Sequence, residues 1–289
     1  MKMNRRAAWS CIIAAATVIG FSAGCAATKP TAASRTAASK ELDNVLASDH
    51  RSAENRARDG YRHPKDTLLF FGLRPDMKVA EVWPGNSGWY TEIIAPLVSA
   101  KGKYYAAQYP ADPKSQYITS ALQEYRAKLQ SRPDLYGKVE VTELGANGGE
   151  IAPPGTLDMV VTFRNLHNWM ARDWAPQAFQ AMYRALKPGG TLGVVEHRGN
   201  PAMPQDSKAK NGYVTEDYAI QLIEGAGFKL VGKSEINANP RDTKDYEQGV
   251  WTLPPTYRLG DKDREKYAAI GESDRFTFKF VKPKTKTKS

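Results

Sequence analysis

The chain is predicted to be an α/β protein with a mainly parallel seven-stranded sheet and helices on both faces. Three observations support this fold class. Short apolar runs alternate with amphipathic helical stretches, which is the pattern of repeated strand–helix–strand units. Residues 157–163 are apolar almost throughout, as in a strand buried on both faces. A turn-forming cluster at residues 84–88 separates an apolar run from a helix, so a ligand-binding turn is expected there.

The first 25 residues are expected to be a targeting signal outside the fold. Arg5 and Arg6 give a basic start, an apolar stretch follows, and small residues precede Cys25. This end is similar to a bacterial lipoprotein signal, which implies lipidation of Cys25, and an ordinary secretory signal is the alternative. Cys11 would leave with the signal, so no intramolecular disulfide is expected. The sequence thus predicts an exported, periplasm-facing lipoprotein of the bacterial envelope, with a membrane partner at Cys25.

Between the signal and the body, two further segments are expected. Residues 26–40 contain Ala, Thr and Ser without apolar periodicity and are predicted to be a flexible tether. Residues 41–77 are predicted to form a helical cap over the sheet, with one polar helix at 41–58 and another that has Pro64 in its first turn. A basic disordered tail is expected at residues 283–289.

The body, residues 78–282, is expected to hold all seven strands. These are residues 79–82, 103–107, 139–142, 157–163, 191–196, 228–231 and 276–280. Helices are expected after the first strand, at 116–130, after a capping Asp173 and after a capping Thr215. Residues 237–271 are rich in polar residues, Pro and Gly, and are expected to form a loop-rich insertion.

The charge of the chain limits the kinds of partner that can be expected. The 289 residues carry a formal net charge of +10, but no recognised nucleic-acid motif accompanies it, so no nucleic-acid partner is expected. The sequence gives no indication of the oligomeric state.

Several motifs occur in a characteristic order along the body. Glu81 ends the first strand before the glycine turn, the run RALKPGG at 184–190 ends a later helix, and EGAGF at 224–228 joins a helix to a strand. In this order the chain resembles class I S-adenosylmethionine-dependent methyltransferases. More narrowly, residues 61–64, 81–85 and 162–165 resemble a group of predicted bacterial methyltransferases of unassigned substrate. The resemblance covers about residues 51–282 and implies a Rossmann-like fold, S-adenosylmethionine as cofactor and a small-molecule acceptor.

The resemblance also implies cofactor-binding residues. Glu81 is the acid that organises the glycine loop and the ligand amine. Backbone N–H groups near Gly85 and Gly88, with the side chain of Asn86, suit the charged amino-acid end of the cofactor. Gly85 and Gly88 could instead simply make a tight strand-to-helix connection.

This sequence departs from the family pattern at two places. The family has glycines two, four and six residues after the acid, where this chain has Trp83, Gly85 and Ser87, and Gly88 follows one place late. Gln108 stands where an acid would bind the ribose hydroxyls, and an amide lacks the strength of a charge-assisted hydrogen bond.

The resemblance implies that residues 164–169, which follow the fourth strand, face the methyl group that is transferred. His167 is the candidate base, with loop orientation as the alternative role, and Asn168 is assigned with it. Arg164 and Asn165 could hold a carboxylate of substrate or cofactor. The remaining histidines form no ligand-spaced set with Asp or Glu, so no metal is expected.

Arginines crowd the predicted cap, at positions 51, 56, 58 and 62. They are expected either to form a basic lid over an anionic substrate or to be solvated helix charges paired with Glu54 and Asp59. At the level of function, methyl transfer by an envelope-tethered protein is predicted, and a non-catalytic envelope ligand-binding protein on the same fold is the alternative.

Overall fold

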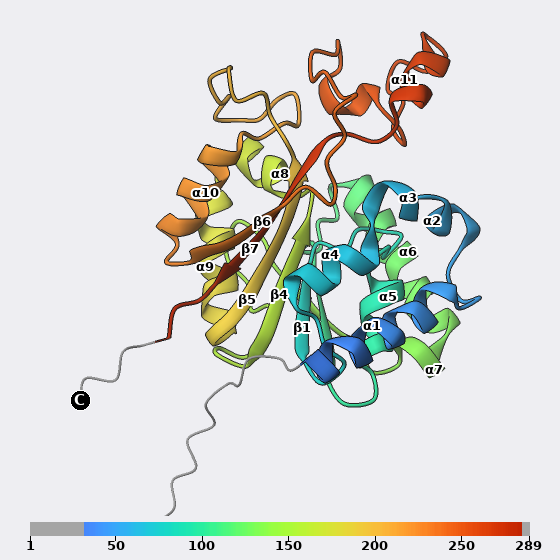
Figure 1. Cartoon of the computed structure of the whole chain (residues 1–289), viewed down its shortest axis with the longest axis vertical. Coiled ribbons are helices and arrows are strands. Elements are labelled where there is room, and N and C mark those ends of the chain that lie inside the picture. Colours follow the sequence, from blue (N-terminus) through green and yellow to red (C-terminus); the bar gives the residue numbers. More distant parts are fainter. Residues whose placement is uncertain (1–31, 285–289) are drawn as a thin grey trace, which may run out of the picture.

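The structure, a computed structural model, describes residues 32–284 and contains one seven-stranded sheet (Figure 1). The strand order is β3-β2-β1-β4-β5-β7-β6, and only β7 runs antiparallel to its neighbours. The strands are β1 (Lys78–Val82), β2 (Lys103–Gln108), β3 (Glu140–Glu143), β4 (Leu157–Phe163), β5 (Leu186–His197), β6 (Lys229–Ser234) and β7 (Arg275–Val281). The predicted mainly parallel α/β class is confirmed.

Helices cover both faces of the sheet, as predicted (Figure 1). One face carries α1 (Ala32–Ala47), α4 (Pro64–Phe71), α5 (Thr91–Val98), α6 (Gln116–Ser131) and α7 (Pro133–Tyr136), and the other carries α8 (Leu166–Ala171), α9 (Ala175–Ala185) and α10 (Glu216–Gly225). The short helices α2 (Ala53–Ala57) and α3 (Asp59–Arg62) precede α4. Two apolar cores result, one on each side of the sheet.

Strand periodicity supplies both cores. In β1, Val79 packs into the core under α4 and α5, whereas Ala80 packs into the core under α9, because successive side chains point to opposite faces. Gly193 in β5 lets α4 approach closely: a Cβ there would lie 2.5 Å from the ring of Phe71. The cap therefore touches the sheet through α4.

The cap differs from the prediction at its beginning. Helix α1 starts at Ala32, so the described part of the predicted tether (26–40) is helical, with Ala38 and Leu42 fully buried. The tether pattern was misleading because alanine buries a helix face without an obvious apolar periodicity. The expected single helix over 41–58 is also wrong: α1 ends at Ala47, and Ser52 caps a separate α2 by accepting from the Asn55 N–H.

Two predicted caps need correction. Helix α9 begins at Ala175, and Asp173 adopts a left-handed φ of +60° and pairs with Lys208 instead of capping the helix. Thr215 is at the predicted N-terminal position of α10 but makes no side-chain capping hydrogen bond. The segment 237–271 is loop-rich as expected, with a 3-10 turn at Gly249–Thr252 and a short α11 (Arg264–Ile270).

Some predictions fall on parts of the chain that the structure does not describe. The signal at 1–25 with Cys25, the first part of the tether and residues 285–289 of the tail lie outside residues 32–284. Within those residues, no helix has the length and apolar character needed to cross a bilayer.

Candidate functional site

A cavity of about 310 Å³ lies at the carboxyl ends of β1, β4 and β5. The strand order reverses between β1 and β4, and ligands of open parallel sheets bind at such a switch point. The cavity is lined by the turn after β1, the start of α8, the end of β5 and residues 250–256, with two cap arginines. The predicted turn at residues 84–88 thus contributes to a cavity, as the sequence suggested.

Two bulky residues at this edge hold strained backbone conformations. Trp83 follows β1 with φ +53°, and Arg164 follows β4 with φ +60°. Each backbone N–H donates to a neighbouring strand, from Trp83 to the Ala107 carbonyl at 2.8 Å and from Arg164 to the Val195 carbonyl at 2.7 Å. Non-glycine residues in this region cost about 1–3 kcal/mol and are concentrated at functional sites. The sheet therefore fixes both side chains at the mouth of the cavity.

The two predicted loop glycines have different roles. Gly85 lines the cavity with φ +74°, and a Cβ there would meet no atom within 4 Å. Gly88 does not line the cavity; a Cβ there would lie 2.9 Å from the ring of Tyr125. Asn86 lines the cavity and donates to Glu124 Oε2 at 2.6 Å. Gly85 and Asn86 therefore face the cavity, whereas Gly88 allows the start of α5 to pack.

Gln108 and Asn165 organise the loop from beneath. Gln108 is buried at the end of β2 and donates through Nε2 to the Gly85 carbonyl at 3.1 Å, while its Oε1 has no hydrogen-bond partner among the described residues. Asn165 lines the cavity and donates to the Val82 carbonyl at 2.9 Å, which ties the ends of β1 and β4 together. Gln108 does not line the cavity, so its Oε1 is a buried acceptor beneath the loop.

Glu81 lies away from the cavity. Its carboxyl accepts a hydrogen bond from the Tyr104 hydroxyl in the neighbouring strand, and the side chain is 3% exposed. Burial raises its pKa from 4.5 to about 7. The role implied by the resemblance, organising the glycine loop and the ligand amine, has no counterpart in these contacts, which instead hold β1 to β2.

His167 lines the cavity and is held by Glu196, a residue that the sequence analysis did not select. Nδ1 of His167 lies 2.9 Å from Glu196 Oε1. The same carboxylate accepts from the backbone N–H of His167 at 3.3 Å and of His197 at 2.8 Å. Because Glu196 acts as an acceptor in both backbone contacts, we assign Nδ1–H as the donor, and Nε2 of His167 is then an acceptor without a hydrogen-bond partner among residues 32–284.

The structure also brings His197 to this pair, so the expectation that no histidines group with a carboxylate is wrong. Ligand atoms of His167, Glu196 and His197 all lie within 4.8 Å of one another, a spacing that a metal ion could use. Burial and the neighbouring His167 and Arg275 lower the pKa of His197 well below its usual value. Glu196 already accepts three hydrogen bonds, from the backbone N–H groups of His167 and His197 and from Nδ1–H of His167. The neighbouring arginines would also repel a metal cation. A histidine–carboxylate pair therefore explains the geometry better than a metal site.

Arginines dominate the charge of the cavity. Arg58, Arg62, Arg164 and Arg275 line it, and no carboxylate is among its described lining residues. Glu272 lies beside three of them: Arg58 Nε is 2.6 Å and Arg62 Nε 3.7 Å from its oxygens, and Arg275 pairs with it as well. Burial alone would raise the pKa of Glu272, but these arginines hold it well below its usual range.

The cap arginines were expected either to pair with acidic residues of the cap or to form a basic lid over a substrate, and different arginines fit the two roles. Arg51 is 1% exposed and pairs with Asp59, so it is structural. Arg62 packs its guanidinium 4.6 Å from the centroid of the Trp89 ring and reaches the cavity. Neither Arg275 nor Glu272 could be found from the sequence, because both lie at the end of the loop-rich segment without a motif.

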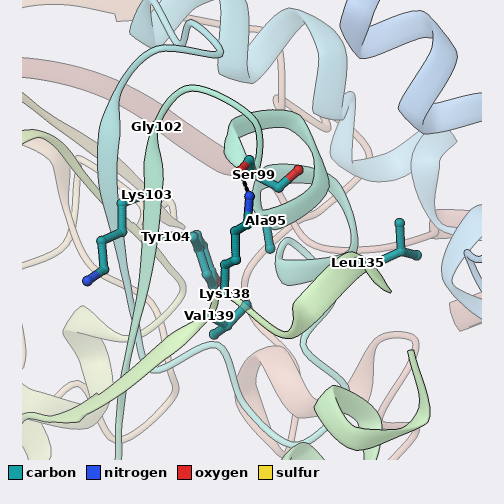
Figure 2. Close-up of a pocket in the computed structure, with 8 residues that line it drawn as sticks. All are labelled: Ala95, Ser99, Gly102, Lys103, Tyr104, Leu135, Lys138 and Val139. Carbon is teal, nitrogen blue, oxygen red and sulfur yellow. Dashed lines mark hydrogen bonds between the residues drawn. The ribbon is translucent and has the colours of Figure 1, made fainter. Parts of the chain in front are cut away.

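A second cavity, of about 260 Å³, lies at the amino end of β2 (Figure 2). It is formed by the end of α5, the start of β2 and residues 135–139, and Lys138 extends across it to donate to the Ser99 carbonyl at 3.0 Å. Its described lining includes no carboxylate and no histidine. Because it lies at the amino end of β2, it is a packing feature and not the candidate site.

Comparison with known proteins supports the fold. No family model and no curated protein matches the chain. A solved S-adenosylmethionine-dependent methyltransferase from Aquifex aeolicus is similar, with a TM-score of 0.53 and 16% identity over 84% of this chain and 98% of that one. The [4+2]-cyclase SpnF is similar with a TM-score of 0.55 and 16% identity over 87% of this chain and 96% of that one.

A third similar structure contains a ligand. Phosphoethanolamine N-methyltransferase 2 from Haemonchus contortus, in complex with S-adenosyl-L-methionine, has a TM-score of 0.53 and 15% identity, over 84% of this chain and 60% of that one. At these identities the likeness shows the fold alone: the chain has the Rossmann-like fold of S-adenosylmethionine-dependent methyltransferases, as predicted. The cyclase demonstrates that this fold also carries other chemistry.

Proposed function

We propose that the protein transfers a methyl group from S-adenosylmethionine to a small acceptor at the cavity formed by β1, β4 and β5. The observation that carries this proposal is the coincidence, on a methyltransferase fold, of an open glycine turn with the His167–Glu196 pair in one cavity. Gly85 and Asn86 line the cavity and would hold the cofactor, whereas Gln108 is buried beneath the turn and would offer its unpartnered Oε1 only after the turn moves. These residues fit the group, although the amide of Gln108 replaces the usual acid.

S-adenosylmethionine supplies an electrophilic methyl group, so that a bond forms from the acceptor nucleophile to the methyl carbon while the electron pair of the breaking carbon–sulfur bond returns to sulfur. His167 takes the proton of the acceptor at Nε2, and Glu196 stabilises the imidazolium through Nδ1–H. Asn165 fixes the two strand ends, and Trp251, whose ring lies 6.0 Å from that of His167, covers the base. Arg164 and Asn168 line the acceptor side of the cavity.

The test is transfer of label from methyl-labelled S-adenosylmethionine to small molecules extracted from cells, with the full chain purified in detergent. Wild-type protein is expected to give a labelled small-molecule product, and His167→Gln is expected to reduce its rate strongly. Binding of the cofactor without any transfer would contradict the proposal.

That outcome would favour the second candidate, a non-catalytic ligand-binding protein on the same fold. One observation supports this candidate. At position 108, where the family has a ribose-binding acid, this chain has a buried glutamine whose amide donates to the Gly85 carbonyl. Native mass spectrometry of protein extracted from membranes would then reveal a bound mass other than S-adenosylmethionine.

Sequence features alone support the proposed cellular context. We propose that this is an envelope lipoprotein lipidated at Cys25, and that it is related to the predicted bacterial methyltransferases whose motifs it resembles. Export separates the enzyme from cytoplasmic cofactor, so it would either act before export or obtain cofactor afterwards. Cys25→Ser is expected to release the protein from the membrane fraction, and retention of the variant would contradict lipidation.

A further inference from the structure

The charge of the candidate site is unbalanced. Four arginines line the cavity, namely Arg58, Arg62, Arg164 and Arg275, here called the arginine cluster. One carboxylate, Glu272, is shared among three of them. The side chains of Arg62 and Arg275 are only 5% and 3% exposed, so water compensates little of their charge.

Arg164 is the least compensated member of the cluster. Its side chain makes no hydrogen bond or salt bridge within residues 32–284, although it lines the cavity. Burial and repulsion from Arg275 lower its pKa to about 10, which still leaves it protonated at neutral pH. Buried Nη2 of Arg58 and Nε of Arg275 also have no hydrogen-bond partner among the described residues. Such unpaired cations are unfavourable without an anion.

The cofactor of the proposed reaction does not balance the charge of the arginine cluster, even if its carboxylate contacts one of the arginines. S-adenosylmethionine carries one carboxylate, one ammonium and one sulfonium at neutral pH, so its binding adds a net positive charge. The compensating charge must therefore come from the other substrate. This step rests on the proposed function.

We propose that the methyl acceptor carries a carboxylate or phosphate group bound by the arginine cluster, with Arg164 as its main ligand. A guanidinium matches both groups because it presents paired N–H donors in one plane. His167 lines the same cavity, so an anion held at Arg164 orients the remainder of the acceptor toward Nε2 of the base. Loss of the sulfonium charge on transfer weakens the attraction between the two products and favours their release.

The test uses calorimetric titration of the full chain in detergent with malonate and, separately, with inorganic phosphate. Each titration is done alone, with S-adenosylmethionine and with S-adenosylhomocysteine. The variants are Arg164→Gln and, as a matched control, Arg126→Gln, which removes an exposed positive charge from α6. Thermal unfolding without ligand checks that each variant is folded; Arg164→Gln is expected to be at least as stable as wild type, because it removes a half-buried cation that has no ion-pair partner among the described residues.

Wild type is expected to bind one of the two anions, and Arg164→Gln to weaken that binding roughly tenfold or more, while Arg126→Gln leaves it unchanged. The anion is expected to increase the affinity for S-adenosylmethionine more than for S-adenosylhomocysteine, because only the former carries a sulfonium. The identity of the bound anion distinguishes a carboxylate from a phosphate acceptor. Failure of both anions to bind wild type, or equal binding by folded Arg164→Gln, would overturn the inference. Anion binding without binding of either cofactor form would leave the anion site standing and overturn the proposed function.

Discussion

Replacement of Glu81 with glutamine is expected to stabilise the fold at neutral and alkaline pH. Burial raises the pKa of Glu81 from 4.5 to about 7, so between these values the folded protein keeps a proton that the unfolded chain has lost. Stability is therefore highest below pH 4.5 and falls as the pH rises to 7. At about 1.4 kcal/mol per pH unit, the loss is on the order of 3 kcal/mol. Glutamine avoids this loss, and its carbonyl can still accept from the Tyr104 hydroxyl.

Urea unfolding of the full chain at pH 5 and pH 8 measures this effect. The free energy of unfolding of Glu81→Gln, relative to wild type, is expected to increase by about 2.5 kcal/mol between the two pH values, because a small part of the loss has already occurred at pH 5. Glu143→Gln, at the exposed end of β3, is the control and should follow wild type. An identical pH dependence in wild type and Glu81→Gln would refute the reasoning. S-adenosylhomocysteine affinity should be nearly unchanged in Glu81→Gln, and a large loss would restore the ligand-binding role that the resemblance implies.

Three further substitutions test the site and its support. His167→Gln is expected to lower the methyl-transfer rate by about 10²–10⁴-fold with little change in cofactor affinity measured by calorimetry, and an unchanged rate would remove the base assignment. Gly88→Ala should cost about 2 kcal/mol in urea unfolding because of its φ of +54° and the ring of Tyr125, whereas Gly60→Ala, with open space around its Cβ, should be nearly neutral. Glu272→Gln should cost about 3–5 kcal/mol in the same assay because it leaves buried arginines unpaired, and a neutral effect would contradict the described ion pairs.

Local patterns in the sequence were sufficient for the sheet and for one part of the site. The apolar run of β4 and the turn at residues 84–88 each depend on neighbours in sequence, so they could be recognised directly. His167 and Arg164 were found because they follow β4, and the carboxyl end of a parallel strand faces the site. Elements whose stability depends on tertiary contact, such as the alanine-rich start of α1, were not recognised.

The partners of these residues could not be predicted from the sequence. Glu196 meets His167 only because β5 lies beside β4, and 29 positions separate the two residues. Glu272 accepts from Arg58, 214 positions away in the sequence, and Arg275 pairs with the same carboxylate. For Glu81 the motif was present, but the side chain does not face the cavity as the motif implied. Its carboxyl instead accepts a hydrogen bond from the Tyr104 hydroxyl in β2 and is buried. Motifs give residue types, whereas the charge and hydrogen bonding of a site depend on pairings that only the fold creates.

The most direct test of the central claim is a calorimetric titration of the full chain with S-adenosylhomocysteine, the product form of the cofactor. Saturable one-to-one binding is expected; it should be lost when a bulky side chain fills the open turn, as in Gly85→Trp, and kept in Gly60→Ala. Absence of detectable heat at millimolar ligand, with the wild-type protein folded, would contradict the central claim.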